Sequence, residues 1–203
     1  MEAPAPSLNK SDFTASSHRG RLFEGMARAV AAQGFAACTI ADIVREAAVS
    51  RRTFYEHFQT KADCLIAMYE SSSRNALRQL QGMLDPSRHW QHQVEEAMAA
   101  YLGVLAENPT VLRALFIDIL SLGTEGLAAR RRVNHEIAEF LLSVVNPQRV
   151  DAVMSQAMAM AVVGGINELV LQLIEQDRIQ DIHSITDTTS ALIRAVVGAT
   201  EAR

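Results

Sequence analysis

The sequence of residues 39–58 is TIADIVREAAVSRRTFYEHF, and it predicts two short helices joined by a turn. Thr39 has Asp42 three residues further on, so a hydroxyl and a carboxylate can satisfy the free amides of a helix start. Ser50 is placed to cap the second helix, which is expected to run through Phe58. A helix, a three-residue turn and a second helix have the spacing of a helix-turn-helix, whose second helix can lie in the major groove of DNA.

Basic residues lie at the starts of helices in this region. Arg51 and Arg52 fall in the first turn of the second helix, and Lys61 falls in the first turn of the next. The helix dipole disfavours cations there by about 0.3–1 kcal/mol each, whereas a bound phosphate reverses the sign. Hydroxyl and imidazole groups that commonly reach phosphates or base edges follow on the same segment: Thr53, Tyr55 and His57. Exposed arginines are also common at helix ends, so charge and spacing alone leave a solvated face as the alternative.

Helical periodicity dominates the chain on both sides of this stretch. No segment alternates apolar and polar residues as a half-buried strand does, so the predicted fold class is all-α, with about nine helices. The first helix is expected over residues 17–34, because Gly34 can adopt the left-handed conformation that ends a helix. Further helices are expected over residues 109–122, about 149–177 and about 184–198.

Composition places the chain among folded globular proteins. It has 203 residues, of which 49% are hydrophobic and 21% charged. The formal net charge of -4 excludes a wholly basic nucleic-acid coat, and residues 10–70 carry eight basic against seven acidic residues. Any DNA-binding surface must therefore be a local patch.

Sequence patterns for export, membrane spans and thiol chemistry are also informative. The start of the chain lacks the pattern of a secretory signal, and the longest apolar run, residues 157–166, is too short to span a membrane. Cys38 and Cys64 form no disulfide framework or metal motif, and small buried positions are favoured over redox sensors. We therefore expect a cytoplasmic protein that makes no contact with a membrane.

The stretch from residue 20 to residue 70 resembles the N-terminal DNA-binding domain of TetR-family transcriptional regulators. The resemblance rests on the order and spacing of these residues: Gly34, Thr39, Ile40, Ile43, Val49, Ser50, Thr53, Phe54, Tyr55, His57, Phe58, Lys61 and Leu65. It implies a dimeric, all-α repressor that binds a palindromic operator through a three-helix domain. It also implies that a small inducer binds the C-terminal domain and releases the DNA.

The same resemblance implies roles for single residues. Phosphate contacts are implied for Thr39, Tyr55, His57 and Lys61, and contacts to base edges for Arg51, Arg52 and Thr53. Phe54 and Phe58 would hold the recognition helix against the first helix. Two positions depart from the family pattern, because Ala48 stands where glycine is usual in the turn and Arg52 where glycine often begins the recognition helix. The second departure leaves the operator sequence open.

Three parts of the chain are expected on this basis. A mobile tail over residues 1–16 precedes a helix-turn-helix domain over residues 17–62 and a ligand-binding and dimerisation domain over residues 63–203. Residues 164–169, GGINEL, are similar to the penultimate helix of many such regulators, and small residues let two helices approach closely. We expect a homodimer through the last two helices of each protomer, which would form a four-helix bundle.

An inducer pocket is expected among the fifth to eighth predicted helices, from the one that carries Met98 to the one over about residues 149–177, where apolar and deformable side chains gather. The candidate lining residues are Met98, Tyr101, Phe116, Ile119, Phe140, Met158 and Asn167. Few polar groups accompany them, which favours a hydrophobic or amphipathic ligand over a sugar phosphate. For each apolar residue among them, an ordinary core position is the alternative.

The sequence contains none of the motifs that would indicate an enzyme. GxSxG, HExxH, GxxxxGK and paired ExxH helices are all missing, so we expect no catalysis and no cofactor. His89, His92 and Glu96 could share a helix face and bind a transition metal, but a solvated helix start is the favoured interpretation and no metal site is expected. A DNA-binding regulator without an inducer is the alternative function.

Overall fold

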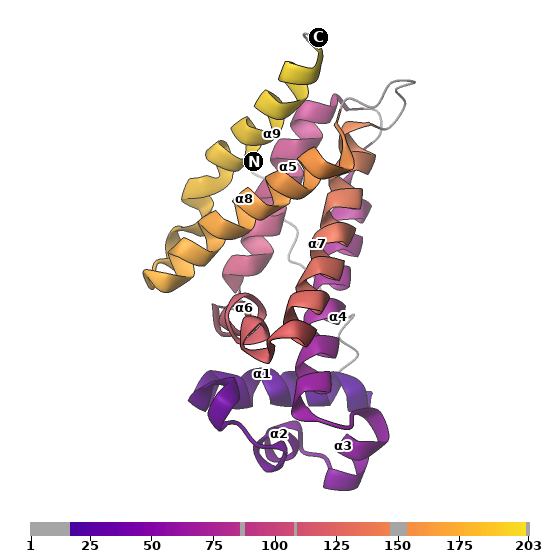
Figure 1. Cartoon of the computed structure of the whole chain (residues 1–203), viewed down its shortest axis with the longest axis vertical. Coiled ribbons are helices and arrows are strands. Elements are labelled where there is room, and N and C mark those ends of the chain that lie inside the picture. Colours follow the sequence, from indigo (N-terminus) through magenta and orange to yellow (C-terminus); the bar gives the residue numbers. More distant parts are fainter. Residues whose placement is uncertain (1–16, 86–87, 108, 147–153, 202–203) are drawn as a thin grey trace, which may run out of the picture. The chain divides into compact units, whose positions relative to one another are not determined.

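The computed structural model describes residues 17–85, 88–107, 109–146 and 154–201 (Figure 1). Every regular element in these ranges is a helix, nine of them α-helices and two of them 3-10 helices, which confirms the predicted all-α class. The chain divides into two compact units, one ending at Met68 and the other beginning at Tyr69. The tail predicted over residues 1–16 lies outside the described residues.

The N-terminal unit holds α1 (His18–Ala37), α2 (Ile40–Ala47), α3 (Arg51–His57) and the start of α4 (Lys61–Met83). The Ser17 hydroxyl accepts a hydrogen bond from the Gly20 amide at 3.1 Å and so caps α1. Helical geometry breaks at Gly34, whose φ of +77° is open to glycine at little cost. The predicted end of the first helix is therefore confirmed, although one further turn follows it.

The turn between α2 and α3 is held by its caps. Thr39 and Asp42 form the predicted capping box, and the Ser50 hydroxyl accepts from the Thr53 amide at 3.0 Å. Ala48 takes the left-handed conformation, with φ 50° and ψ 46°, in the place where the family pattern has glycine. The turn thus keeps its left-handed residue although the side chain is a methyl group.

An apolar core joins the helices of the N-terminal unit. Leu22, Met26 and Ile43 have no exposed surface, and neither does Phe54 on α3. The ring of Phe58 lies 5.8 Å from that of Phe54 and is 7% exposed. Both phenylalanines therefore occupy the predicted core positions that hold α3 in place.

The C-terminal unit contains the rest of α4 and, among the described residues, five further α-helices. These are α5 (Trp90–Glu107), α6 (Pro109–Phe116), α7 (Thr124–Val145), α8 (Gln156–Glu175) and α9 (Thr186–Glu201). Two 3-10 helices, η1 (Asp118–Leu122) and η2 (Ile179–Ile185), precede α7 and α9. Helix α5 packs against α7, α9 and η2, and α8 packs against α7, α9 and η2.

Two predicted helix boundaries are wrong. The helix expected over residues 109–122 ends at Phe116, because the chain tightens into η1 around Ile119, which is fully buried. The helix expected to start near residue 149 starts at Gln156 instead, because the Ser155 hydroxyl caps it by accepting from the Met158 amide at 3.3 Å. Residues 147–153 lie outside the described residues.

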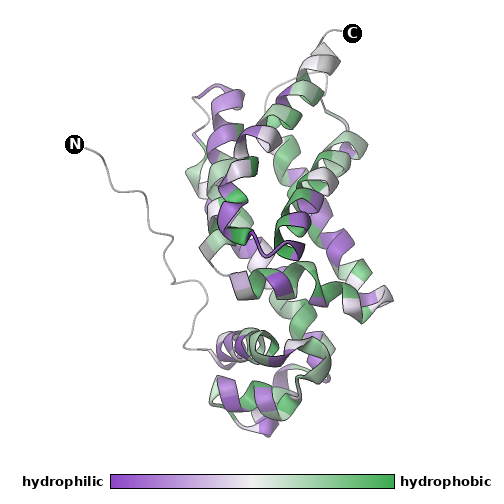
Figure 2. Ribbon diagram, turned by 90° about the vertical axis from the view of Figure 1, so that its left-hand side faces the viewer, coloured by the Kyte–Doolittle hydropathy of each residue, from purple (hydrophilic) through white to green (hydrophobic). Residues whose placement is uncertain are grey.

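Two apolar clusters form the core of the C-terminal unit, whose helices carry both hydrophobic and hydrophilic residues (Figure 2). One cluster includes Val94, Leu141 and Ile193, and the other includes Leu102 and Ile182. Among the described helices, α8 alone is long and apolar enough to cross a membrane by length and composition. The core helix of a soluble protein meets the same criterion, and α8 supplies buried residues to both clusters.

Candidate nucleic-acid interface and apolar cavity

Helix α3 presents its cations to solvent. Arg51 and Arg52 are both exposed at the start of the helix, and the Arg52 side chain keeps 90% of its surface accessible. The Arg52 Nε donates to Glu56 Oε1 at 3.1 Å, one helical turn along. Such an exposed pair contributes only about 0.3–0.5 kcal/mol, so a stronger anion can displace the Glu56 carboxylate.

The remaining polar groups of α3 share its exposed side. Tyr55 is 56% exposed and meets the buried Phe54 ring edge-on at 5.6 Å. His57 is exposed, and its ring lies 6.3 Å from that of His18. The Thr53 hydroxyl lies 2.9 Å from the Ser50 hydroxyl. One side of α3 is therefore fixed in the core while the other offers hydrogen-bond donors.

Thr39 is exposed, but its side chain already serves the cap of α2. Its hydroxyl donates to Asp42 Oδ2 at 2.6 Å and accepts from the Asp42 amide at 3.2 Å. The hydrogen bonds from Thr39, with a further contribution from Arg45, hold the pKa of the Asp42 carboxyl well below its usual range. The start of α2 is thus fixed by an ionised cap.

The Lys61 side chain has a role that the sequence did not reveal. Its ammonium donates to the carbonyl oxygens of Phe35 at 2.8 Å, Ala36 at 3.2 Å and Cys38 at 2.7 Å. These hydrogen bonds use all three N–H donors of the ammonium at the C-terminal end of α1, where the helix dipole favours a cation. No short-range pattern indicates contacts across more than twenty residues, so this anchor was missed, and the phosphate contact of Lys61 stays a prediction.

Both cysteines lie inside the N-terminal unit. Cys38 and Cys64 are free thiols with 1% and no exposed surface, respectively. Burial raises the pKa of both thiols, and that of Cys64 far above its usual range. Because the thiolate is the reactive form, neither cysteine is reactive in the folded unit.

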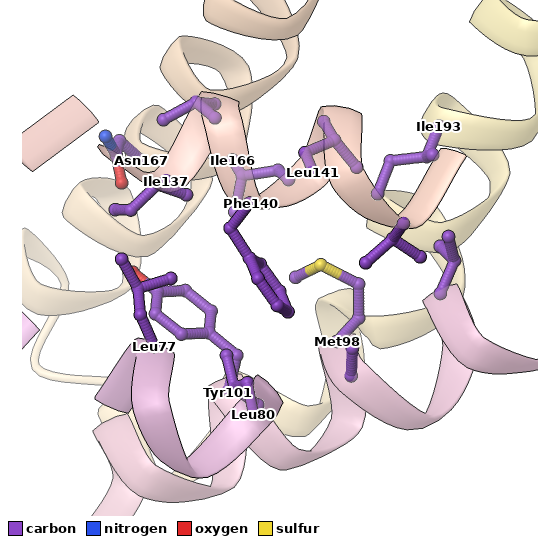
Figure 3. A pocket seen from close by; sticks show the side chains of 14 residues that line it. Leu77, Leu80, Met98, Tyr101, Ile137, Phe140, Leu141, Ile166, Asn167 and Ile193 are labelled. Carbon is purple, nitrogen blue, oxygen red and sulfur yellow. The ribbon is translucent and has the colours of Figure 1, made fainter. Parts of the chain in front are cut away.

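An apolar cavity of about 60 Å³ lies in the C-terminal unit, between α4, α5, α7, α8 and α9. Of the seven predicted lining residues, Met98, Tyr101, Phe140 and Asn167 line this cavity (Figure 3). The other three do not: Phe116 packs on the second apolar cluster, Met158 packs on the first, and Ile119 is buried in η1. These three are therefore core positions, the alternative that the sequence left open.

Helices α4 and α9 supply lining residues that the sequence did not indicate. Leu77 and Leu80 come from α4, and Ile193 comes from α9. The expectation restricted the pocket to the fifth to eighth helices, although the apolar face of α4 is visible in the sequence. A leucine on an amphipathic helix has the same pattern whether it fills a core or borders a cavity.

Two polar side chains border the cavity. Burial raises the pKa of Tyr101 to about 12, so its hydroxyl stays protonated and can donate a hydrogen bond. The Asn167 amide donates to Asn134 Oδ1 at 3.0 Å and is 6% exposed. In the view of Figure 3, Tyr101 and Asn167 lie toward one end of the cavity with Leu77, and Met98 and Ile193 lie toward the other.

The histidines considered as metal ligands have other surroundings. His92 Nδ1 lies 3.9 Å from Glu95, while Glu96 forms an ion pair with Arg88. The His89 ring lies 6.0 Å from the ring of Trp90. Within the described ranges, no group of three or more His, Cys, Asp or Glu residues is arranged to hold a metal ion.

Helices α8 and α9 expose small residues on their surfaces. On α8 the exposed small residues include Ala157, Ala161 and Gly164, and on α9 they include Ala191, Ala195 and Gly198, beside the larger exposed Leu192. A Cβ atom built at Gly164 would meet no other atom within 4 Å. Both helices could therefore approach another helix closely.

A three-helix unit with an exposed basic helix, followed by a separate all-α unit, defines a helix-turn-helix protein with an additional helical domain. Residues 23–68 match the family model of the bacterial regulatory proteins of the tetR family. This match confirms, over these residues, the resemblance inferred from the sequence.

One relative is itself described as a transcriptional regulator. The chain is 32% identical over 79 residues to YxbF of Bacillus subtilis, an uncharacterised helix-turn-helix-type transcriptional regulator. The match covers 39% of this chain and 21% of YxbF, so the chain spans about a fifth of the length of this relative.

Two solved structures share the fold. The transcriptional regulator FadR from Bacillus subtilis, in complex with stearoyl-CoA, has a TM-score of 0.74 at 13% identity, with 85% of this chain and 96% of FadR covered. The fatty acid degradation regulator FadR from Bacillus halodurans has a TM-score of 0.73 at 14% identity, with the same coverage. At these identities the likeness supports the fold alone.

Proposed function

We propose that this protein is a transcriptional regulator of the cytoplasm that binds a palindromic operator as a homodimer and represses until a ligand releases it. The exposed polar side of α3, with Arg51 and Arg52 at its start, is the observation that carries the DNA-binding part. In the proposal, Arg51, Arg52 and Thr53 approach base edges, and Thr39, Tyr55, His57 and Lys61 contact phosphates. The match of residues 23–68 to the family model and the complete burial of Phe54, which fixes α3 in the unit, support this DNA-binding role.

Selection of bound fragments from genomic DNA tests this proposal, because it returns both the operator and the genes beside it. We expect an inverted repeat whose half-sites lie about one helical turn apart or a multiple of it. The affinity for this repeat should fall steeply with salt. Fragments without a shared sequence, or binding that ignores salt, would contradict DNA recognition by α3.

Dimerisation is proposed through the exposed faces of α8 and α9. Small side chains on both helices would let two copies form a closely packed four-helix bundle. Ala161→Arg on α8 should then give a monomer in sedimentation equilibrium, whereas Leu127→Arg on the exposed side of α7 should leave the dimer intact. A dimer that survives Ala161→Arg would place the interface elsewhere.

The ligand is proposed to be a hydrophobic or amphipathic small molecule that binds in the apolar cavity. FadR of Bacillus subtilis, which has a similar fold, was crystallised with stearoyl-CoA, and this supports a ligand with a long apolar part. A ligand releases DNA only if it binds the DNA-incompetent state more tightly, by about 2.7 kcal/mol for a hundredfold shift.

Substitutions that fill the cavity test the ligand proposal. Met98→Trp and Phe140→Trp should abolish the response to the ligand and leave operator affinity unchanged. Phe116→Trp is the matched control, because Phe116 does not line the cavity. An unchanged ligand response in both cavity variants would move the ligand to another site.

A regulator without an inducer is the second candidate. The observation in its favour is the cavity volume of about 60 Å³, since ligand pockets usually measure about 300–1,000 Å³. This candidate predicts that Met98→Trp stabilises the protein and that no apolar molecule alters DNA binding.

A further inference from the structure

A second hollow adjoins the apolar cavity on the outside of the C-terminal unit. This groove of about 570 Å³ lies between α4 and α7, and most of the residues that line it are polar or charged. Leu77 and Phe140 line both the groove and the cavity, so these two side chains form the partition between them. A rotamer change at either residue would join a polar entrance to an apolar interior.

Charged side chains of both signs line the groove. Arg74 lies 3.7 Å from Glu136, and Glu139 lies 3.6 Å from His135, which carries a charge only when it is protonated. Arg78 is different, because its guanidinium bonds only to the side-chain oxygen of Asn75 and has no carboxylate within 4.0 Å among the residues described. Within the described part of the chain, Arg78 is therefore the basic side chain of the groove without a carboxylate partner within 4.0 Å.

We propose that this groove binds the anionic head of an amphipathic ligand at Arg78, while the ligand's apolar chain passes between Leu77 and Phe140 into the cavity. The inference rests on the proposed ligand response and specifies the class of ligand. A guanidinium can form two parallel hydrogen bonds to a carboxylate or a phosphate oxygen pair, which makes an anion the matching head group.

The arrangement of polarity inside the cavity supports this orientation. Leu77 lies toward the same end as Tyr101 and Asn167 in Figure 3, and the opposite end near Met98 and Ile193 is apolar. A ligand with its head in the groove would pass the two polar side chains first and end among apolar ones. With the head in the groove, the cavity of about 60 Å³ would have to open only for the apolar chain.

Two probes with the same chain length distinguish the contribution of the head group from that of the apolar chain. They are dodecanoate, which is an anion, and dodecanol, which is neutral. Binding can be followed below micelle-forming concentrations through the fluorescence of Trp90, the single tryptophan, which packs on the same apolar cluster as Met98. We expect dodecanoate to bind about tenfold more tightly than dodecanol. Arg78→Gln should abolish this preference by weakening dodecanoate alone.

The control variants define what would overturn the inference. Arg113→Gln removes an exposed arginine outside the groove and should keep the preference. Met98→Trp should block both probes, which is measured by titration calorimetry because this variant adds a second tryptophan. Equal affinity for both probes, or a preference that survives Arg78→Gln, overturns the anionic head site but leaves the proposed ligand response standing. If neither probe binds a protein that still binds its operator, both the head site and the proposed response to chain-like ligands fail.

Discussion

The N-terminal unit holds two helices in close contact at Gly25, whereas the C-terminal unit keeps a cavity between its helices. In the first, a Cβ atom built at Gly25 of α1 would lie 2.6 Å from the carbonyl oxygen of Ile43 and 2.7 Å from the Cβ of Ala47. In the second, a cavity of about 60 Å³ remains among five helices. Under the proposed function, a unit that presents α3 to DNA benefits from a single fixed packing, whereas a unit that admits a ligand benefits from space that side chains can rearrange.

The largest expected effect is a loss of stability on filling the α1–α2 contact. Gly25→Val should lower the free energy of unfolding of the N-terminal unit by about 3 kcal/mol, because backbone atoms of α2 would have to move. Urea unfolding followed by circular dichroism measures this change. Gly82→Ala on α4 is the matched control and should stabilise by about 0.5–1 kcal/mol, since nothing lies within 4 Å of its Cβ position. Equal behaviour of the two variants would mean that α1 and α2 are not in close contact.

A pair of alanines gives a direct comparison of the two interiors. Ala47→Val should cost about 1–3 kcal/mol, because Ala47 is 3% exposed and lies against Gly25. Ala97→Val adds the same volume beside the cavity and should change stability by less than about 1 kcal/mol. Thermal unfolding of both variants checks the difference, and a larger cost at Ala97 would contradict a deformable C-terminal interior.

Substitutions of two basic residues of the N-terminal unit should have different effects, one on stability and the other on DNA recognition. Lys61→Ala should lower the free energy of unfolding by about 1–3 kcal/mol, because three carbonyl oxygens lose a charged donor. Arg52→Ala should leave stability unchanged and lower the preference for operator over scrambled DNA by about 1–3 kcal/mol.

A salt series on the same two variants examines the predicted phosphate contact of Lys61. If that contact exists, Lys61→Ala should also reduce the slope of log affinity against log salt by about one. A lower affinity with an unchanged slope would leave Lys61 as an anchor of α1 alone. A loss of stability in Arg52→Ala would show that this side chain does not act at the surface only.

The smallest expected effect concerns the pH dependence of the C-terminal unit. The pKa of Tyr101 is raised to about 12 by burial, so between about pH 10 and 12 the unfolded chain loses this proton while the folded chain keeps it. Stability should therefore fall as the pH rises through this range. Tyr101→Phe should flatten the dependence, measured as urea midpoints from pH 9 to 11, and an unchanged slope would mean that other groups dominate.

The local sequence predicted the N-terminal unit well for a physical reason. Its caps at Thr39 and Ser50 act within three residues, and its amphipathic helices bury Phe54 and Phe58 as expected. The contact of Lys61 with the end of α1 joins residues far apart in the chain, and no periodicity encodes it.

The C-terminal unit was predicted less completely. Tyr101 and Phe140 line the cavity and Phe116 does not, a difference that the sequence could not show because an apolar residue at helical spacing is compatible with either a core or a cavity wall. Only the assembled helices decide between the two, and they also brought in Ile193. The contact of Tyr101 and Phe140 with a ligand stays a prediction. The break between α6 and η1 was missed for a similar reason, since the burial of Ile119 is a tertiary property.

The location of the two cysteines allows the local opening of the N-terminal unit to be measured by thiol labelling. Cys38 and Cys64 are the only cysteines of the chain, and both are shielded within the N-terminal unit. A thiol reagent can therefore attack only molecules in which that unit has opened, so the rate of labelling measures its opening and closing under native conditions. Openings confined to the C-terminal unit would leave this signal unchanged. Labelling rates with and without operator DNA would thus report how strongly DNA binding suppresses the local unfolding of the N-terminal unit.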